Sequence, residues 1–192
     1  MTGVDLSRDM LSQAAQKARD AGLEIPFVCQ DMCHLQLHRR QDAILCTCDG
    51  VNYLTTPDRA RRFFRAAYAQ LKPGGALIFD VSTPEKLSGT LGDHTLGCQE
   101  EDISYIWQNA YHPRTRTVDM RLSIFVGDTD GRYQRLEETQ TQRAHTLEEL
   151  TKYLVEAGFA DIRAYGKLAL RAPRPGDERW HIRAIRPKEN AK

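Results

Sequence analysis

Short apolar runs that end at or within two residues of an acidic residue alternate with helical patterns through the first 80 residues. The runs end at Asp5, at Gln30, at Thr47 and at Phe79, and we predict a strand in each: the run up to Asp5, Ile25–Gln30, Ala43–Thr47 and Ala76–Phe79. Residues 8–21 and the segment from Thr56 to Leu71 carry apolar residues at helical spacing. Strands alternating with helices predict an α/β fold with a mostly parallel, doubly wound sheet.

The pattern changes after residue 95. Three runs, Ser104–Tyr111, Thr117–Val126 and Tyr133–His145, alternate polar with apolar residues, which predicts an antiparallel β meander inserted at about residues 97–146. Leu147–Ala157 then returns to helical spacing, followed by predicted strands at Ile162–Tyr165 and Trp180–Ile185. With 192 residues, the chain predicts one domain, residues 1–192, that contains this insert.

The composition is that of an ordinary globular protein. It is 41% hydrophobic and 28% charged with a formal net charge of +1, which provides no bulk attraction to nucleic acid or to an anionic membrane. No apolar run approaches the roughly 18–20 residues of a membrane span. Five cysteines, an odd number, are interpreted as reduced thiols, which predicts a cytoplasmic protein.

Asp5 is the first candidate site residue. In a nucleotide-binding α/β sheet, an acid at the tip of this strand holds two ribose hydroxyls, and it normally follows a glycine-rich loop by about 20 residues. Ser7 can cap the following helix, which leaves the Asp5 carboxylate for a ligand, although a capping role for Asp5 is the alternative.

Four features in this order resemble the class I S-adenosylmethionine-dependent methyltransferases. They are the run Gly3-Val4-Asp5-Leu6-Ser7 followed by Met10, the run Gln30-Asp31-Met32, the polar elbow after Ala43–Thr47, and Leu71-Lys72-Pro73-Gly74-Gly75 before a strand. The meander, with Asp49, Asn52 and Tyr53 at the elbow, looks most like a small bacterial subgroup of uncharacterised methyltransferases with an antiparallel β insert.

The resemblance implies a Rossmann-like fold and S-adenosyl-L-methionine as cofactor. It implies that Asp5, with Leu6 beside it, binds the ribose hydroxyls and that Met10 packs near the adenine. Asp31 would accept a hydrogen bond from the adenine amino group while Met32 covers the ring, and Cys48 and Asp49 would line the methionine end. A carboxylate accepts two hydroxyl donors at once, and a thioether packs well on a flat ring. A turn-forming role is the alternative for Asp31.

The chain departs from this family at its start, because the first strand and the glycine-rich loop do not precede Asp5. The family's strand order places that strand between the strand ending at Asp5 and the strand at Ala43–Thr47. We therefore expect an interrupted sheet there, with poor solubility and weakened cofactor affinity for residues 1–192. The preferred hypothesis is a misplaced start in a complete gene, with a truncated pseudogene second.

The expected activity is methyl transfer to an unidentified acceptor, a small molecule rather than nucleic acid. Asp49 or Tyr53 would accept a proton from the acceptor where one must be lost, with ordinary loop roles as the alternative. No metal is required. The runner-up functions are a nicotinamide-dependent oxidoreductase of Rossmann type and a non-catalytic truncated remnant. The oligomeric state is left open.

Several other features have two interpretations. The stripe Tyr105, Trp107 and Tyr111 is expected to form the core of the meander, with a substrate platform as the alternative. His112 and His145 are expected to be solvated rather than catalytic bases. The cysteines and histidine in Cys29-x-x-x-Cys33-His34 and Cys46-x-Cys48 do not match the spacing of a structural zinc site. The basic residues from Arg163 to Arg186 are expected on a solvated face, with nucleic-acid binding as the alternative.

Overall fold

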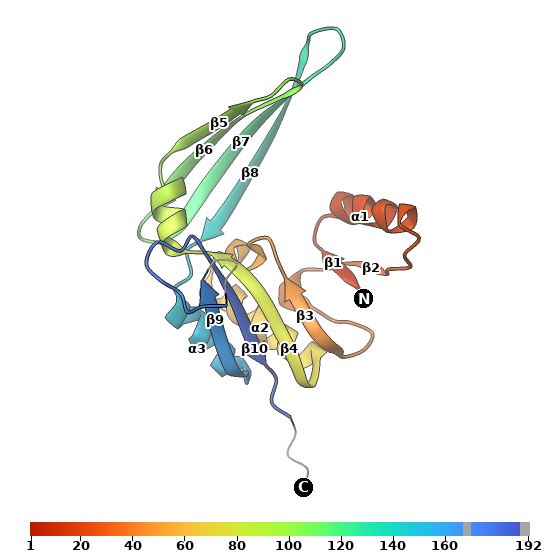
Figure 1. Cartoon of the computed structure of the whole chain (residues 1–192), viewed down its shortest axis with the longest axis vertical. Helices are drawn as coiled ribbons and strands as arrows, with labels where there is room; N and C mark the ends of the chain where they lie inside the picture. Colours follow the sequence, from red (N-terminus) through yellow and green to blue (C-terminus); the bar gives the residue numbers. More distant parts are fainter. Residues whose placement is uncertain (167–169, 189–192) are drawn as a thin grey trace.

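The computed structural model describes residues 1–166 and 170–188, which form three β-sheets with helices packed against them (Figure 1). The strands are β1 (Gly3–Asp5), β2 (Phe27–Cys29), β3 (Gln41–Cys46), β4 (Leu71–Ser82), β5 (Thr95–Gln99), β6 (Ile103–His112), β7 (Thr117–Gly127), β8 (Tyr133–Arg143), β9 (Ala160–Gly166) and β10 (Arg179–Ile185). The helices are α1 (Arg8–Asp20), α2 (Pro57–Gln70) and α3 (Leu147–Ala157), with three short helical segments, η1 (Met32–His34), η2 (Gly50–Tyr53) and η3 (Lys86–Leu91).

The central sheet has the strand order β3-β4-β10-β9. Strand β4 runs parallel to β3, whereas β10 is antiparallel to both β4 and β9. Strand β4 starts at Leu71, earlier than the predicted Ala76, because Leu71 already pairs with Gln41 before a register shift. The run Lys72-Pro73-Gly74-Gly75, predicted to come before the strand, therefore lies within β4.

One face of the central sheet carries the main hydrophobic core. The fully buried Phe63 and Phe64 of α2 pack there, and the Phe64 ring centroid lies 5.4 Å from that of Phe79 in β4. Leu150 and Leu154 of α3 join the same cluster. The opposite face is more open, since Ile78 on that side of β4 is 38% exposed.

Local sequence signals set where the helices begin. The side chain of Ser7 accepts a hydrogen bond from the Met10 amide at the start of α1, and Thr56 does the same for α2, which has Pro57 in its first turn. Helix α3 begins with a reciprocal capping box between Thr146 and Glu149 and ends before Gly158, which adopts a left-handed conformation with φ of 101°.

Strands β1 and β2 form a parallel pair of their own, and among residues 1–166 and 170–188 neither is hydrogen-bonded to β3. This confirms the expected interruption between the strand that ends at Asp5 and the strand predicted at Ala43–Thr47, which is β3. The pair and α1 lie to one side of the central sheet, with the N-terminus near β2 (Figure 1). Contact with the rest of the protein runs through η1, where Asp31 forms an ion pair with Arg59 of α2.

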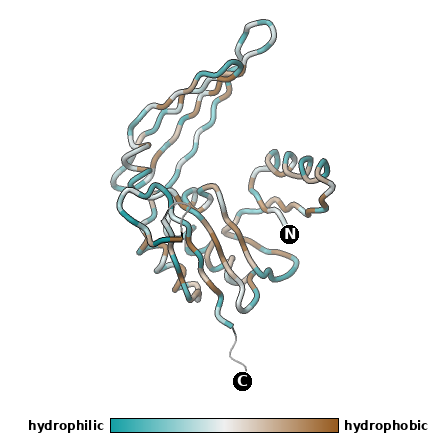
Figure 2. The backbone as a smooth tube through the Cα atoms, viewed as in Figure 1, coloured by the Kyte–Doolittle hydropathy of each residue, from teal (hydrophilic) through white to brown (hydrophobic). Residues whose placement is uncertain are grey.

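The predicted meander is confirmed as an antiparallel sheet with the order β5-β6-β7-β8. Strand β5 was not predicted, and it extends the insert back to Thr95. Residues paired across the strands share a face, so that one face carries Tyr105, Trp107 and Ile124 whereas the other is mainly polar. The sheet is attached at its base and projects away from the central sheet, with apolar and polar residues alternating along its strands (Figures 1 and 2).

No helix in the described part of the chain is long and apolar enough to cross a membrane.

Candidate functional site

The predicted site residues lie where strands end. Asp5 is the last residue of β1, Asp31 precedes η1 just after β2, and the elbow Thr47–Tyr53 follows β3. Since β1 is parallel to β2 and β3 is parallel to β4, these ends lie at the carboxyl edges of their sheets. Ligands of open α/β sheets bind at that edge.

Asp5 has one oxygen engaged in the turn into α1. Its Oδ1 accepts a hydrogen bond from the Ser7 amide at 2.8 Å. No described residue donates a hydrogen bond to Oδ2, and the neighbouring apolar side chains Leu6 and Met10 are 68% and 61% exposed. An open carboxylate oxygen beside exposed apolar side chains fits the ribose and the flat base of a nucleoside.

Asp31 serves as a turn acid in this structure. Its Oδ1 accepts from the Cys33 amide at 2.9 Å, and the Arg59 guanidinium lies 3.1 Å from Oδ2. Burial raises the pKa of Asp31, but the Cys33 amide and Arg59 outweigh it and lower the pKa overall, so the side chain is a carboxylate at neutral pH. Met32 packs against the main core, and a methyl group on Gly50 of the elbow would lie 3.8 Å from the Met32 Cε. Met32 thus lies beside the elbow.

The elbow has an unusual backbone conformation. Cys48 and Asp49 have φ of 59° and 61°, the left-handed region that non-glycine residues rarely occupy. Such strain persists only where surrounding contacts impose it, and it is found at functional sites. Here the contact is an ion-pair cluster. The Arg179 Nη1 of β10 lies 2.6 Å from Asp49 Oδ1, and the same Nη1 is ion-paired with Asp80 at the end of β4.

An open pocket of about 440 Å³ lies beside this cluster. Its lining combines the elbow with the ends of β4 and β10: Thr47, Cys48, Asp49, Ile78, Phe79, Asp80, Arg179 and His181. The pocket is lined by two carboxylates, Asp49 and Asp80, and by one guanidinium, Arg179. In the sequence, Asp80 follows a predicted strand and Arg179 belongs to the basic group near the C-terminus, but no local pattern links either of them, or His181, to the elbow, because β10 lies about 100 residues beyond the end of β4.

Asn52 and Tyr53 join the elbow to the base of the meander. Asn52 is fully buried, and its side chain donates to the carbonyl oxygens of Ser82 and Arg143 while accepting from the Ser82 amide. The Tyr53 hydroxyl donates to Gln140 of β8 at 2.5 Å. Burial raises the pKa of Tyr53, with a further contribution from the charge of Asp49, so that Tyr53 stays protonated near neutral pH.

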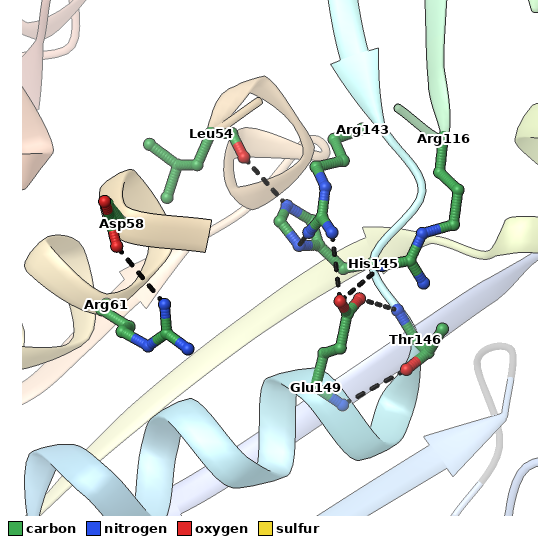
Figure 3. Close-up of polar contacts among 8 residues, drawn as sticks. All are labelled: Leu54, Asp58, Arg61, Arg116, Arg143, His145, Thr146 and Glu149. Carbon is green, nitrogen blue, oxygen red and sulfur yellow. Dashed lines mark hydrogen bonds and ion pairs between the residues drawn. The ribbon is translucent and has the colours of Figure 1, made fainter. Parts of the chain in front are cut away.

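A second buried polar network attaches β8 to α3 (Figure 3). Arg143, only 5% exposed, donates to Glu149 at 3.0 Å and lies 2.8 Å from His145 Nδ1, while Arg116 donates to the same Glu149 at 2.5 Å. His145 Nε2 lies 3.1 Å from the Leu54 carbonyl oxygen. The expectation that His145 is solvated is wrong, because it is fully buried. Burial and the charge of Arg143 lower its pKa to about 4, so it is neutral and donates to Leu54.

The aromatic stripe on the meander is mainly core, as expected. Trp107 and Tyr111 pack against a small cluster formed by Leu87, Leu91, Val118, Met120 and Ala144. Tyr105, further out on the same face, is half-buried. His112 lies on the opposite, polar face, where its Nε2 is 2.9 Å from Asp119.

The basic residues near the C-terminus are partly or largely exposed, and most of them are held in ion pairs. Arg171 pairs with Asp177, and both Arg163 and Arg183 pair with Asp161. Arg186 donates to the carbonyl oxygens of Tyr68 and Leu71. Lys167, also in the predicted group, lies outside the described residues.

All five cysteines are free thiols. Burial raises the pKa of Cys33 to about 11 and of Cys46 to about 12, so both are protonated. Among the described residues, no three histidine, cysteine or acidic side chains lie close enough together to hold a metal ion.

Comparison with known proteins identifies relatives over nearly the whole chain. Residues 1–75 match the family model of a methyltransferase domain. The chain is 35% identical over 189 residues to the methyltransferase-family protein YqeM of Bacillus subtilis (strain 168), a match that covers 98% of this chain and 76% of that protein. It is 33% identical over 179 residues to a methyltransferase-family protein of Geobacillus sp. (strain WCH70), covering 93% and 72%.

A solved structure also matches. The fold is similar to the crystal structure of an S-adenosylmethionine-dependent methyltransferase from Clostridium acetobutylicum ATCC 824, with a TM-score of 0.91 and 31% identity. The alignment covers 98% of this chain and 75% of that one, including the inserted antiparallel sheet.

Proposed function

Because the chain belongs to the S-adenosylmethionine-dependent methyltransferases, we propose that it methylates a small molecule held in the pocket beside the elbow. Family membership sets aside the nicotinamide-dependent oxidoreductase. The observation that carries the small-molecule proposal is the size of the pocket, about 440 Å³, which suits a metabolite rather than a polymer.

For the cofactor, we assign the positions that the resemblance indicated. S-adenosylmethionine supplies a methyl group made electrophilic by its sulfonium. The Asp5 carboxylate would bind the ribose hydroxyls, with Leu6 and Met10 near the base. Asp31, whose oxygens already face the Cys33 amide and Arg59, would in addition accept from the adenine amino group beside Met32, and Cys48 and Asp49 would line the methionine end. The fit rests on the chemistry of the donor set, a carboxylate for hydroxyls and soft apolar side chains for a ring.

For the acceptor, the protein's main tasks are orientation and the exclusion of water. We assign proton acceptance to Asp49, because its carboxylate lies in the pocket and is held in place by Arg179. Tyr53, which the sequence also nominated, is better suited to donating a hydrogen bond, since its pKa is raised and its hydroxyl proton is directed at Gln140.

Nucleic acid is the less favoured acceptor. The arginines that suggested it are engaged in ion pairs with Asp161 and Asp177 or in the cluster with Asp49, so they provide few free cations for phosphates. The five free thiols support our proposal that the protein works in the cytoplasm.

The cofactor assignment is tested by calorimetry with S-adenosylhomocysteine. Asp5→Asn removes the charge from bonds that contribute about 1.5–3 kcal/mol each, so we expect affinity to fall at least about tenfold. Asp9→Asn, an exposed acid one turn further into α1, is the matched control and is expected to bind as the parent does. Equal affinity in the parent and Asp5→Asn would refute the assignment.

The acceptor assignment is tested by transfer of a labelled methyl group. A panel of small amines, hydroxyl compounds and carboxylates is compared with total RNA under the same conditions. We expect label in a small molecule and at least about a hundredfold lower kcat for Asp49→Asn, a typical loss when a general base is removed. Label that appears in RNA alone would overturn the small-molecule proposal.

A further inference from the structure

Strand β8 is the outer strand of the meander, and in the described part of the chain no other strand pairs with its far edge. Residues 133–139 are all exposed, and this part of the strand projects beyond the body of the protein (Figure 1). Contact with the body begins near the base of the strand, where Gln140 meets Tyr53. The outer half of β8 therefore presents a row of unpaired backbone N–H and C=O groups.

This edge carries the charged residues Arg135, Glu137 and Glu138 but neither of the other usual protections against pairing. Natural edge strands are commonly blunted by proline, by charged side chains, lysine above all, or by being very short. Strand β8 has 11 residues, Tyr133–Arg143, and contains neither proline nor lysine. A long, regular edge of this kind is a template for another strand.

The exposed half of β8 also carries an apolar position in line with its neighbours. Leu136, 45% exposed, lies across from Ile124 of β7, which in turn lies across from Tyr105 of β6. A further strand placed against β8 would extend this apolar row and cover Leu136.

We propose that β8 pairs antiparallel with β8 of a second copy, about a two-fold axis at Leu136, which joins the two meanders into one continuous sheet. An axis perpendicular to the sheet keeps paired residues on one face and places Leu136 opposite Leu136 of the second copy. Arg135 then lies opposite Glu137 of the second copy, and Glu137 lies opposite Arg135 of the second copy.

Charge selects this register over its neighbours. An axis at position 135 would oppose two arginines, and one at position 137 would oppose two glutamates. An axis at position 134 would pair Arg135 with Tyr133. Like charges directly opposite destabilise a strand pair, whereas opposite charges stabilise it. Among these registers, only the one at Leu136 sets both arginines against glutamates.

The side chains of Arg135 and Glu137 are already close together and exposed in one copy of the protein. Arg135 and Glu137 form an ion pair along one strand, and their side chains are 59% and 50% exposed. In the pair of strands the four side chains would alternate in sign at the corners of a square, so each charge would have two opposite neighbours. Gln140 and its hydrogen bond to Tyr53 lie outside the paired segment, residues 133–139, so both elbows keep their link to the meander.

The test is the mass of the purified protein by analytical ultracentrifugation over about a hundredfold range of concentration, since dimer population follows mass action. We expect a dimer for the parent. Arg135→Glu alone and Glu137→Arg alone each replace two attractive pairs with two repulsive ones, so each is expected to weaken dimerisation at least about tenfold. The double variant with both changes restores the alternation and is expected to recover the dimer.

Arg121→Glu is the matched control, because Arg121 is an exposed arginine on the polar face of the inner strand β7. It is expected to leave the dimer unchanged. The far-ultraviolet circular dichroism spectrum, expected to be unaltered in all variants, separates dissociation from unfolding. A parent that stays monomeric over the whole range, or a dimer that the single charge reversals do not weaken, would overturn the proposal.

Discussion

His145 shows how burial changes the chemistry of a residue that looks like a base in the sequence. It is fully buried between Arg143 and the Leu54 carbonyl group, and it must be neutral to fit there (Figure 3). Its pKa of about 4 in the folded protein lies below the value of 6.5 for an unperturbed histidine. The unfolded chain therefore binds a proton in a pH range where the folded protein does not.

This difference predicts a loss of stability in mild acid. The contribution of His145 is fully present above pH 6.5 and is lost as the pH falls from 6.5 towards 4. Between pH 7 and pH 5 we expect the free energy of unfolding to drop by about 2 kcal/mol, measured by urea denaturation. His145→Gln should abolish most of this dependence, whereas His112→Gln, at an exposed site on the meander, should retain it. If the free energy of unfolding of His145→Gln fell between pH 7 and pH 5 by as much as that of the parent, groups other than His145 would cause the loss of stability.

At the scale of elements, Asn52 connects the elbow to two strands that are remote in sequence. Its side chain makes three hydrogen bonds to the backbone of Ser82 at the end of β4 and of Arg143 at the end of β8. Asn52→Ala would leave these buried groups unpaired, and we expect the free energy of unfolding to fall by about 3 kcal/mol.

The matched control is Asn109→Ala in β6. Asn109 is also buried, but its side chain donates only to the His94 carbonyl oxygen, so we expect a loss of about 1 kcal/mol. Urea denaturation of both variants provides the comparison. Equal losses would mean that the hydrogen bonds of Asn52 contribute no more than those of an ordinary buried asparagine.

At the scale of the whole molecule, the β1–β2 pair is the least integrated part of the described chain. It shares no hydrogen bond with the central sheet, and two short strands without a larger sheet are only marginally stable. We predict that backbone amides of residues 3–5 and 27–29 exchange with deuterium about two orders of magnitude faster than those of β4 and β10, measured by mass spectrometry. Equal protection from exchange in the β1–β2 pair and in the central sheet would indicate that the contact between η1 and α2 makes the two sheets unfold together.

Much of this architecture follows from local patterns in the sequence. Periodicity placed the three helices, and Ser7 and Thr56 placed the starts of α1 and α2, because capping depends on residues only three positions apart. The cap of α3, Thr146, was not predicted. Alternating polarity predicted the three long strands of the meander. The short strand β5 and the π-helical η3 were missed, since five or six residues carry too little periodicity to be recognised.

The candidate site, too, could be predicted from the sequence only in part. Asp5, Asp31 and Asp49 could be nominated from the sequence because each follows an apolar run, and the carboxyl ends of strands are where such folds bind ligands. Which residues they meet was decided by tertiary structure alone. The cluster of Asp49 with Arg179 and the bond from Asn52 to Arg143 join residues 130 and 91 positions apart. Packing also decided that His145 is buried and neutral, since desolvation depends on what surrounds a side chain and leaves no local signature in the sequence.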